Sequence, residues 1–325
     1  MSSVLIGIPY HVSDDKYYLD MTLLSIREKL GKDVDILIVT DENSPVLTVP
    51  TKAYQTRVPG HGIGKARNAA GLYAYNNKYD CLIFMDSHMI VLSDDFLKIC
   101  KSKIGQPRIV VAENYTGPFK EILKYLIPPR IDETKYTLGS FLDKYTWRWA
   151  YIYRSATNKT VMTTEPSYSV RREVLEALIQ AQGKPTLAEY WGKESFDLTV
   201  SAARLGYSID IYPDIKIAHI YKVGSPSWSS RFTNTVCVHE PFCGILSGSV
   251  YLNGIKWGDC VFALKHYSDI SRLPVDKQIC ELVKKYDKDA MMRIRSFNSY
   301  AKYTLDDVYK RLEEYLIGAM WSFVS

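Results

Sequence analysis

Apolar runs and helical periods alternate along the first half of the chain. Apolar positions recur on one helical face from Leu19 to Leu30, and Gly31 follows them as a helix stop. We predict strands over residues 4–8, 34–39, 81–85 and 109–112, and helices over residues 19–30, 65–75 and 94–103, with a turn-rich stretch through residues 45–60. Strands separated by helices are typical of a parallel sheet covered on both faces, which binds ligands at the carboxyl ends of its strands.

The second half is less regular. Residues 115–160 are rich in aromatic and basic side chains and are expected to be irregular, with one or two helices. Helices over residues 171–182 and 194–205 and a strand over residues 207–212 resume the α/β pattern, and a Gly-, Ser- and Trp-rich loop follows His219. The tail over residues 276–325 is predicted to be largely helical, because Leu305, Val308, Leu312 and Leu316 have amphipathic spacing.

That tail has two interpretations. Its apolar face could pack on the rest of the chain or on a second copy in a homo-oligomer, or it could contact a membrane surface peripherally. Lys310 and Arg311 would assist a membrane contact, but four acidic residues nearby oppose it (Asp306, Asp307, Glu313 and Glu314). We therefore favour packing.

Composition narrows the class of protein. The 325 residues are 46% hydrophobic and 24% charged, which is a globular balance, and no apolar run reaches the roughly 18 residues of a spanning helix. The opening residues do not resemble a signal peptide, so a cytoplasmic location is expected. A net charge of +5 spread along the chain gives no support to nucleic-acid binding.

Cys81 is expected to be a buried thiol, and a disulfide between Cys237 and Cys243 is left open.

Two carboxylates follow predicted strands, Asp41 and Asp86. In an extended segment residues i and i+2 point the same way, so Asp86 and His88 could hold one cation. One oxygen and one nitrogen ligand suit Mn²⁺ better than Ca²⁺. The alternative is a strand-ending Asp that caps a turn beside a hydrogen-bonded His.

The glycine-rich stretch from Gly60 to Lys65 resembles two nucleotide-binding motifs but fits neither. Its spacing is neither that of the dinucleotide fingerprint nor that of the P-loop. It is a turn that enters a helix, whose start, with Lys65 and Arg67, could meet an anion.

Four motifs follow one another along the chain: Asp41, Gly62–Asn68, Asp86–His88 and Trp191–Glu194. In this order they resemble the motifs of the GT-A glycosyltransferases. The likeness is to the polypeptide N-acetylgalactosaminyltransferases and the broader family 2 enzymes. It extends through Ser167-Tyr168-Ser169-Val170-Arg171-Arg172 and Ile217-Ala218-His219-Ile220-Tyr221, and covers roughly residues 3–222. Departures are Lys193 in place of a glycine, Glu165-Pro166 in place of two small residues, and the absence of a lectin-like domain.

The resemblance implies a GT-A fold, a mostly parallel central sheet flanked by helices with a largely helical C-terminal extension. Residues 1–222 would form the catalytic domain, its nucleotide-binding half being about 1–112 and its acceptor and sugar half about 113–222. Residues 223–325 would form the loop and the helical extension.

The resemblance also implies roles for single residues. Asp86, His88 and His219 would bind Mn²⁺ or Mg²⁺, and Glu194, Trp191 and Asp86 would be catalytic. Pro9, Asp41, Arg67, Asp86 and Ser87 would bind the nucleotide sugar, with Asp41 accepting from the base and Arg67 meeting uracil or phosphate. The other histidines, His11 among them, receive no role.

The function implied is a metal-dependent transferase that moves a sugar from a nucleotide sugar, expected to be UDP-linked, to a glycan, lipid-linked or protein acceptor. Ser195 stands where inverting galactosyltransferases carry an Asp that resembles a general base, so retention of configuration is expected. The alternatives are a sugar-phosphate nucleotidyltransferase and a non-catalytic glycosyltransferase-like binding module.

Overall fold

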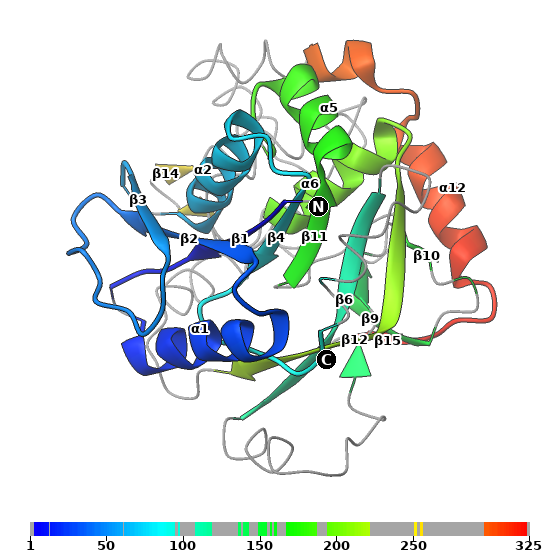
Figure 1. Cartoon of the computed structure of the whole chain (residues 1–325). Coiled ribbons are helices and arrows are strands. Elements are labelled where there is room, and N and C mark those ends of the chain that lie inside the picture. The colour runs from blue at the N-terminus through cyan, green and yellow to red at the C-terminus, as the bar shows by residue number, and fades with distance from the viewer. Residues whose placement is uncertain are drawn as a thin grey trace.

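The structure is a computed structural model of the whole chain (Figure 1). It describes residues 3–12, 14–60, 62–94, 97, 108–118, 136–137, 139–142, 149–154, 157, 159–160, 167–186, 194–221, 250–251, 254–255 and 296–323. Most of the helix expected over residues 94–103 lies outside these ranges. So do Trp191, the loop expected beyond His219, and the pair Cys237 and Cys243.

The chain begins with a strand, a helix and a strand, as its pattern predicts. These are β1 (Val4–Pro9), α1 (Lys16–Leu30) and β2 (Val34–Asp41). Asp15 caps α1 by accepting a backbone N–H of the first turn, and Gly31 ends the helix with a φ of 79°. Because β1 and β2 are parallel, the intervening helix returns the chain to the same end of the sheet.

A second cycle consists of β3 (Tyr54–Val58), α2 (Ile63–Asn76), β4 (Cys81–Met85) and the short β5 (Met89–Val91). The helix and β4 confirm the pattern, and Cys81 is a buried free thiol as expected. The turn-rich interval contains a strand that the pattern did not predict. β3 is mostly exposed and lies at the edge of the sheet, so it lacks the apolar run by which a buried strand is recognised.

The main sheet has the order β10-β12-β6-β11-β4-β1-β2-β3. Its second half consists of β6 (Arg108–Pro118), β10 (Lys159–Thr160), β11 (Ser167–Arg171) and β12 (Ser208–Tyr221). The strands β3, β2, β1 and β4 are parallel, β11 runs antiparallel between β4 and β6, and β12 is parallel to β6. The α/β class with a mostly parallel core is therefore confirmed.

The described part of residues 115–160 contains strands and does not test the expectation of one or two helices in this interval. It contains the end of β6, then β7 (Tyr136–Thr137), β8 (Gly139–Leu142), β9 (Trp149–Arg154) and β10. Aromatic residues have high β propensity, and β9 alternates Trp149, Tyr151 and Tyr153 with other side chains. The strand expected over residues 207–212 is also longer than predicted, since β12 continues to Tyr221 past an irregularity after Tyr212.

The helices α5 (Arg172–Gln182), α6 (Glu194–Arg204) and α12 (Leu305–Leu316) confirm three predicted segments. α12 buries Val308 and Leu312 and contacts α6, so this face packs within the chain itself. Met320–Phe323 is not helical but forms β15, which joins β9 and β8 in a three-stranded sheet. A small hairpin pairs β13 (Val250–Tyr251) with β14 (Gly254–Ile255).

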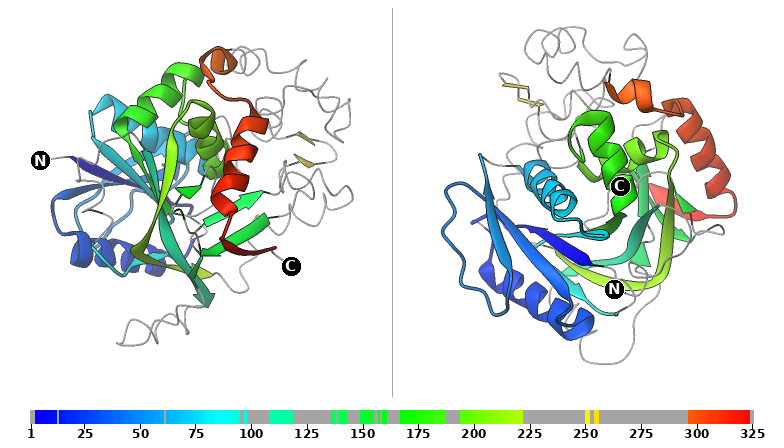
Figure 2. Two further views of the ribbon diagram at one scale, coloured as in Figure 1. Left: turned by 90° about the vertical axis from the view of Figure 1, so that its right-hand side faces the viewer. Right: turned by 45° about the horizontal axis from the view of Figure 1, so that its top comes forward.

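Helices cover both faces of the main sheet, as Figures 1 and 2 show. α1 packs on one face with residues of β1, β2, β4 and β5, in a core that includes Leu23, Ile26 and Ile83. α2, α5 and α6 pack on the other face, around Phe84 and Tyr168. Among the described residues, no helix is both long and apolar enough to cross a bilayer.

Gly7 lets α2 approach β1 closely. A Cβ at this position would lie 2.7 Å from the Cβ of Ala70, nearer than two carbon atoms can pack. The missing side chain thus sets how near α2 lies to the sheet, and with it the position of Arg67 three residues earlier in the helix.

The division of the chain at residue 222 stays a prediction.

Candidate functional site

The carboxyl ends of neighbouring parallel strands carry the candidate residues. Pro9 ends β1, Asp41 ends β2, and Asp86 follows β4 directly. Because β2, β1 and β4 are adjacent and parallel, these ends lie along one edge of the sheet. This is the edge at which open α/β sheets bind ligands.

Asp86 and His88 lie in the turn between β4 and β5, not in the extended segment that the sequence suggested. Their side chains approach one another because the chain turns here. The backbone N–H of Ile220 donates to the carbonyl of His88, 2.9 Å away, so the turn is joined to β12. That bond brings the neighbouring His219 to the turn.

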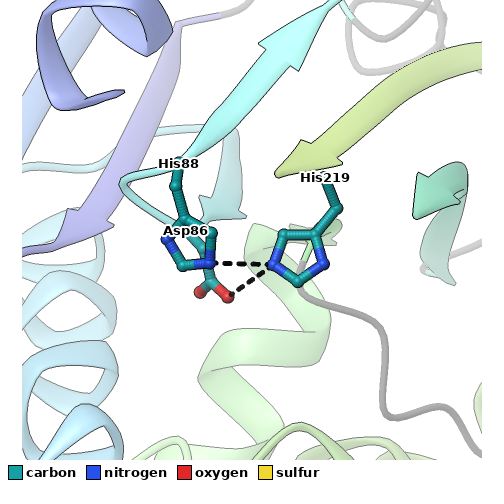
Figure 3. Close-up of side chains that lie close together, drawn as sticks. All are labelled: Asp86, His88 and His219. Carbon is teal, nitrogen blue, oxygen red and sulfur yellow. Dashed lines mark hydrogen bonds and ion pairs between the residues drawn. The ribbon is translucent and has the colours of Figure 1, made fainter. Parts of the chain in front are cut away.

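His219 lies beside Asp86 and His88, as Figure 3 shows. Its strand β12 pairs antiparallel with β5, and His219 stands opposite Met89 in the register. Nε2 of His219 is 2.9 Å from Nε2 of His88 and 4.0 Å from Oδ2 of Asp86. At this distance the two Nε2 atoms cannot both carry a hydrogen, so at least one of them presents a lone pair. The two rings can therefore share one proton or bind one cation.

The chemistry of these donors fits a divalent metal ion. One ligand atom from each of the three side chains lies within 4.8 Å of the other two. Adjacent ligands of an octahedral ion, each about 2.1 Å from the metal, lie about 3 Å apart, which matches the two Nε2 atoms. Imidazole nitrogen with carboxylate oxygen suits Mn²⁺, and the side chains of Asp86 and His219 keep 14% and 18% exposure for further ligands to reach the ion.

Arg67 lies buried behind the metal-ligand candidates. Its Nη2 donates to Oδ1 of Asp86 at 3.0 Å, and its Nη1 is 3.0 Å from Oε1 of Glu194. The side chain is only 2% exposed. The guanidinium therefore joins two carboxylates of the chain itself, and a contact of Arg67 with uracil or phosphate stays a prediction.

Tyr168 completes the surroundings of Arg67. Its ring lies 5.5 Å from the guanidinium carbon, and its hydroxyl is 3.5 Å from Nη1. Burial by itself lowers the pKa of Arg67, but the acidic groups of Tyr168, Glu194 and Asp86 raise it more, so the guanidinium stays charged. Burial likewise raises the pKa of Tyr168, which keeps its hydroxyl neutral.

Glu194 begins α6, and its side chain is buried. Ser195 is buried as well, and Asp197 is fully buried, with its carboxylate accepting a hydrogen bond from the Thr186 hydroxyl. The Asp197 carboxylate is therefore hydrogen-bonded within the chain. Trp191 lies outside the described residues, so its place in the site stays a prediction.

Asp41 divides its two carboxylate oxygens between two environments. Oδ1 accepts the backbone N–H of Asn43 at 3.0 Å, the turn-capping bond of the simpler interpretation. Oδ2 is buried and makes no hydrogen bond within the described structure, although Nε2 of His11 lies 3.4 Å from it. The Ser44 hydroxyl in the same turn is also buried without a hydrogen bond among the described residues. Such atoms are suited to a polar ligand.

Sequence reasoning gave no role to two residues that the structure places here. His11 follows β1 by two residues and meets Asp41, and Tyr168 packs on Arg67. Tyr168 lies inside the motif of residues 167–172, so the sequence did contain a signal that it belongs to the site. For His11 the only signal was its place after a strand that ends beside Asp41.

Comparisons with known proteins bear on the fold. No protein-family model matches the chain, and no curated protein matches it. Among solved structures, GalNAc-T7 with UDP, GalNAc and Mn²⁺ is similar with a TM-score of 0.53 and 15% identity over 98% of this chain. The chain spans 57% of the length of that structure. A second similar structure is A197 from STIV, with a TM-score of 0.40 and 13% identity over 68% of this chain and 87% of that one. The likeness to GalNAc-T7 shows that this chain has the GT-A fold.

Proposed function

We propose that the chain is a metal-dependent glycosyltransferase that moves a sugar from a UDP-sugar to an acceptor hydroxyl. The observation that carries the proposal is the convergence of Asp86, His88 and His219 at the carboxyl edge of a GT-A sheet. GalNAc-T7, which shares the fold, was solved with UDP, GalNAc and Mn²⁺. In the transfer, the bond between the anomeric carbon and the diphosphate oxygen breaks, the acceptor oxygen bonds to that carbon, and the hydroxyl proton is released.

The nucleotide site would lie at the ends of β1 and β2. Oδ2 of Asp41 is a buried acceptor without a hydrogen bond among the described residues, and it suits an N–H of a nucleobase such as that of uracil. Pro9 lies on the adjacent strand end, and Nε2 of His11 lies 3.4 Å from the same oxygen. These residues would hold the base while Asp86 and Ser87 meet the donor at the next strand end.

Asp86, His88 and His219 would hold Mn²⁺ or Mg²⁺. When bound, such an ion stabilises the negative charge of the leaving diphosphate. Arg67 would act on this centre through its neighbours, since it fixes one oxygen of Asp86 and one of Glu194. Glu194 would orient the donor sugar or the diphosphate, with Trp191 beside it.

Retention of configuration is the expected outcome of the transfer. An inverting enzyme needs an ionised base within hydrogen-bond reach of the acceptor hydroxyl. Ser195 cannot serve unaided, Asp197 is bound to Thr186, and Glu194 is paired with Arg67. The described residues around Glu194 thus favour a mechanism without such a base.

The test is incubation of the protein with UDP-, GDP- and ADP-sugars and Mn²⁺, with measurement of the nucleotide diphosphate released. We expect release of UDP that requires the metal and is lost in Asp86→Asn. Pyrophosphate formation from a sugar phosphate and a nucleoside triphosphate would instead identify a nucleotidyltransferase. Tight nucleotide binding without any turnover would identify a binding module.

A further inference from the structure

Among the described residues, the short strand β5 pairs with one strand. It pairs with β12 along one edge, which leaves the backbone N–H groups of Met89 and Val91 on the other edge. Met89 and Val91 are 0% and 1% exposed, so water does not reach these donors. An unpaired buried N–H is costly, and the structure must therefore supply acceptors for both groups.

Two hydroxyls of α1 supply the acceptors. Oγ1 of Thr22 accepts the N–H of Met89 at 3.0 Å, and Oγ of Ser25 accepts the N–H of Val91 at 3.1 Å. The two hydroxyls lie three residues apart, on one face of the helix. Ser25 also donates to the carbonyl of Thr22, which orients its lone pairs towards β5.

Thr22 does more than cap the strand edge. Its hydroxyl lies 3.1 Å from the carbonyl oxygen of Ser87 and can donate to it, or to the carbonyl of Tyr18 in its own helix. One fully buried hydroxyl thus contacts the residue before His88 and the residue after it. With the carbonyl of His88 held by the N–H of Ile220, the backbone of residues 87–89 is fixed on both sides.

We propose that Thr22, assisted by Ser25, is a positioning residue that sets the backbone of His88 for metal binding. The inference rests on the proposed function, because it assumes that His88 is a ligand. The hydrogen bonds of the Thr22 hydroxyl are to backbone groups and not to the imidazole of His88. It acts through the backbone on either side of His88, and so controls where the ring meets His219.

The link continues towards the nucleotide site. The hydroxyl of Ser87 donates to Oδ2 of Asp14 at 3.2 Å, and the N–H of Asp14 donates to the carbonyl of His11 at 2.8 Å. The β1–α1 loop and α1 therefore contact the turn of residues 86–88 through Asp14 and Thr22. The same loop places His11 beside Asp41.

The test is the Mn²⁺ affinity of Thr22→Val, which keeps the shape of the side chain and removes the hydroxyl. Mn²⁺ binding is measured from the EPR signal of free Mn²⁺, below the unfolding temperature of each variant. Loss of a partner that orients a ligand lowers metal affinity by about 10- to 100-fold, and we expect a loss in this range. Thr22→Ser keeps the hydroxyl and should restore most of the affinity.

Ile26→Val is the matched control, because Ile26 is equally buried on the same helix but makes no contact with the turn by a polar atom. It should lower the melting temperature without weakening Mn²⁺ binding. Ser25→Ala, which removes the acceptor farther from His88, should weaken binding less than Thr22→Val and keeps the test available if the latter does not fold.

The two possible failures are distinguishable. If the wild-type protein does not bind Mn²⁺, the proposed function is wrong. If the wild type binds Mn²⁺, the metal site stands. The positioning role of α1 is overturned if Thr22→Val or Ser25→Ala binds Mn²⁺ as tightly as the wild type. It is also overturned if Ile26→Val lowers the Mn²⁺ affinity as much as Thr22→Val does.

Discussion

Nε2 of His219 lies 2.9 Å from Nε2 of His88, although the two residues are 131 positions apart in the chain. The approach results from antiparallel pairing of β5 with β12, in which the N–H of Ile220 binds the carbonyl of His88. His219 lies on a strand, and His88 lies in a turn whose backbone is hydrogen-bonded to that strand. These backbone contacts fix the two rings relative to one another, as a metal site would require.

The first prediction concerns the metal ligands. Asp86→Ala and His219→Ala should each abolish Mn²⁺-dependent binding of a UDP-sugar, because each removes one of the three proposed metal ligands. Isothermal titration calorimetry with and without EDTA measures this, and circular dichroism verifies the fold. His11→Ala, which leaves all three donors in place, should still bind Mn²⁺. Undiminished Mn²⁺-dependent turnover in both ligand variants would refute the assignment.

The second prediction concerns the charges around Arg67. Arg67→Met leaves Asp86 and Glu194 without their buried cation, which should lower the free energy of unfolding by about 3–5 kcal/mol in EDTA. Adding Glu194→Gln to Arg67→Met removes one unpaired charge and should recover part of the loss. Urea unfolding of the four proteins in this cycle measures the coupling. Additive effects of the two substitutions would show that Arg67 and Glu194 do not interact.

The third prediction concerns the nucleobase. UDP should raise the melting temperature with Mn²⁺, and less so in EDTA, because it binds only the folded state. Asp41→Asn should weaken UDP binding about 10- to 100-fold, the range for loss of a hydrogen bond to a charged group. Glu42→Gln, at the exposed neighbouring carboxylate, should bind UDP like the wild type. Equal shifts of the melting temperature with ADP, GDP and UDP would count against a base-reading site.

The fourth prediction is stereochemical. If Ser195 stands where inverting enzymes carry the base, and with Asp197 bound to Thr186, transfer from an α-linked donor should give an α-linked product. The anomeric proton coupling in an NMR spectrum of the fresh product reports the configuration. A β-linkage would show that another carboxylate enters the site.

The fifth prediction concerns pH and α12. The Thr304 hydroxyl and backbone N–H bind the Asp307 carboxylate, and these hydrogen bonds hold the pKa of Asp307 below the ordinary value of 3.8. A carboxyl with a lowered folded-state pKa stabilises the fold above pH 3.8, and the contribution is lost as the pH falls through the lower value.

Asp307→Asn should therefore lower the melting temperature near pH 6 and leave it unchanged at a pH below the folded-state pKa. Asp306→Asn, at the adjacent exposed carboxylate, should have a smaller effect near pH 6. If the difference in melting temperature between wild type and Asp307→Asn persists undiminished in acid, the hydrogen bonds between Thr304 and Asp307 do not stabilise α12 through the charge of Asp307.

The sequence by itself determined the elements whose pattern is local. Apolar runs and helical periods predicted β1, α1, β2, α2 and β4, and placed Asp41 and Asp86 after the strands that they follow. It also predicted α12 from the spacing of Val308 and Leu312. Such patterns can be read because a helix and a strand repeat every 3.6 and 2 residues, whatever the rest of the chain does.

Only the tertiary structure decided which distant groups meet. Strand register places His219 against His88, and the close packing of α2 on Gly7 brings Arg67 between two carboxylates. β9 pairs with β15, and β10 pairs with β12, so these strands form with partners far along the chain. The hydroxyl of Thr22 looks in the sequence like any polar residue of a helix. Its contacts exist only because β5 lies beside α1, and no local pattern encodes a hydrogen bond between residues 67 positions apart.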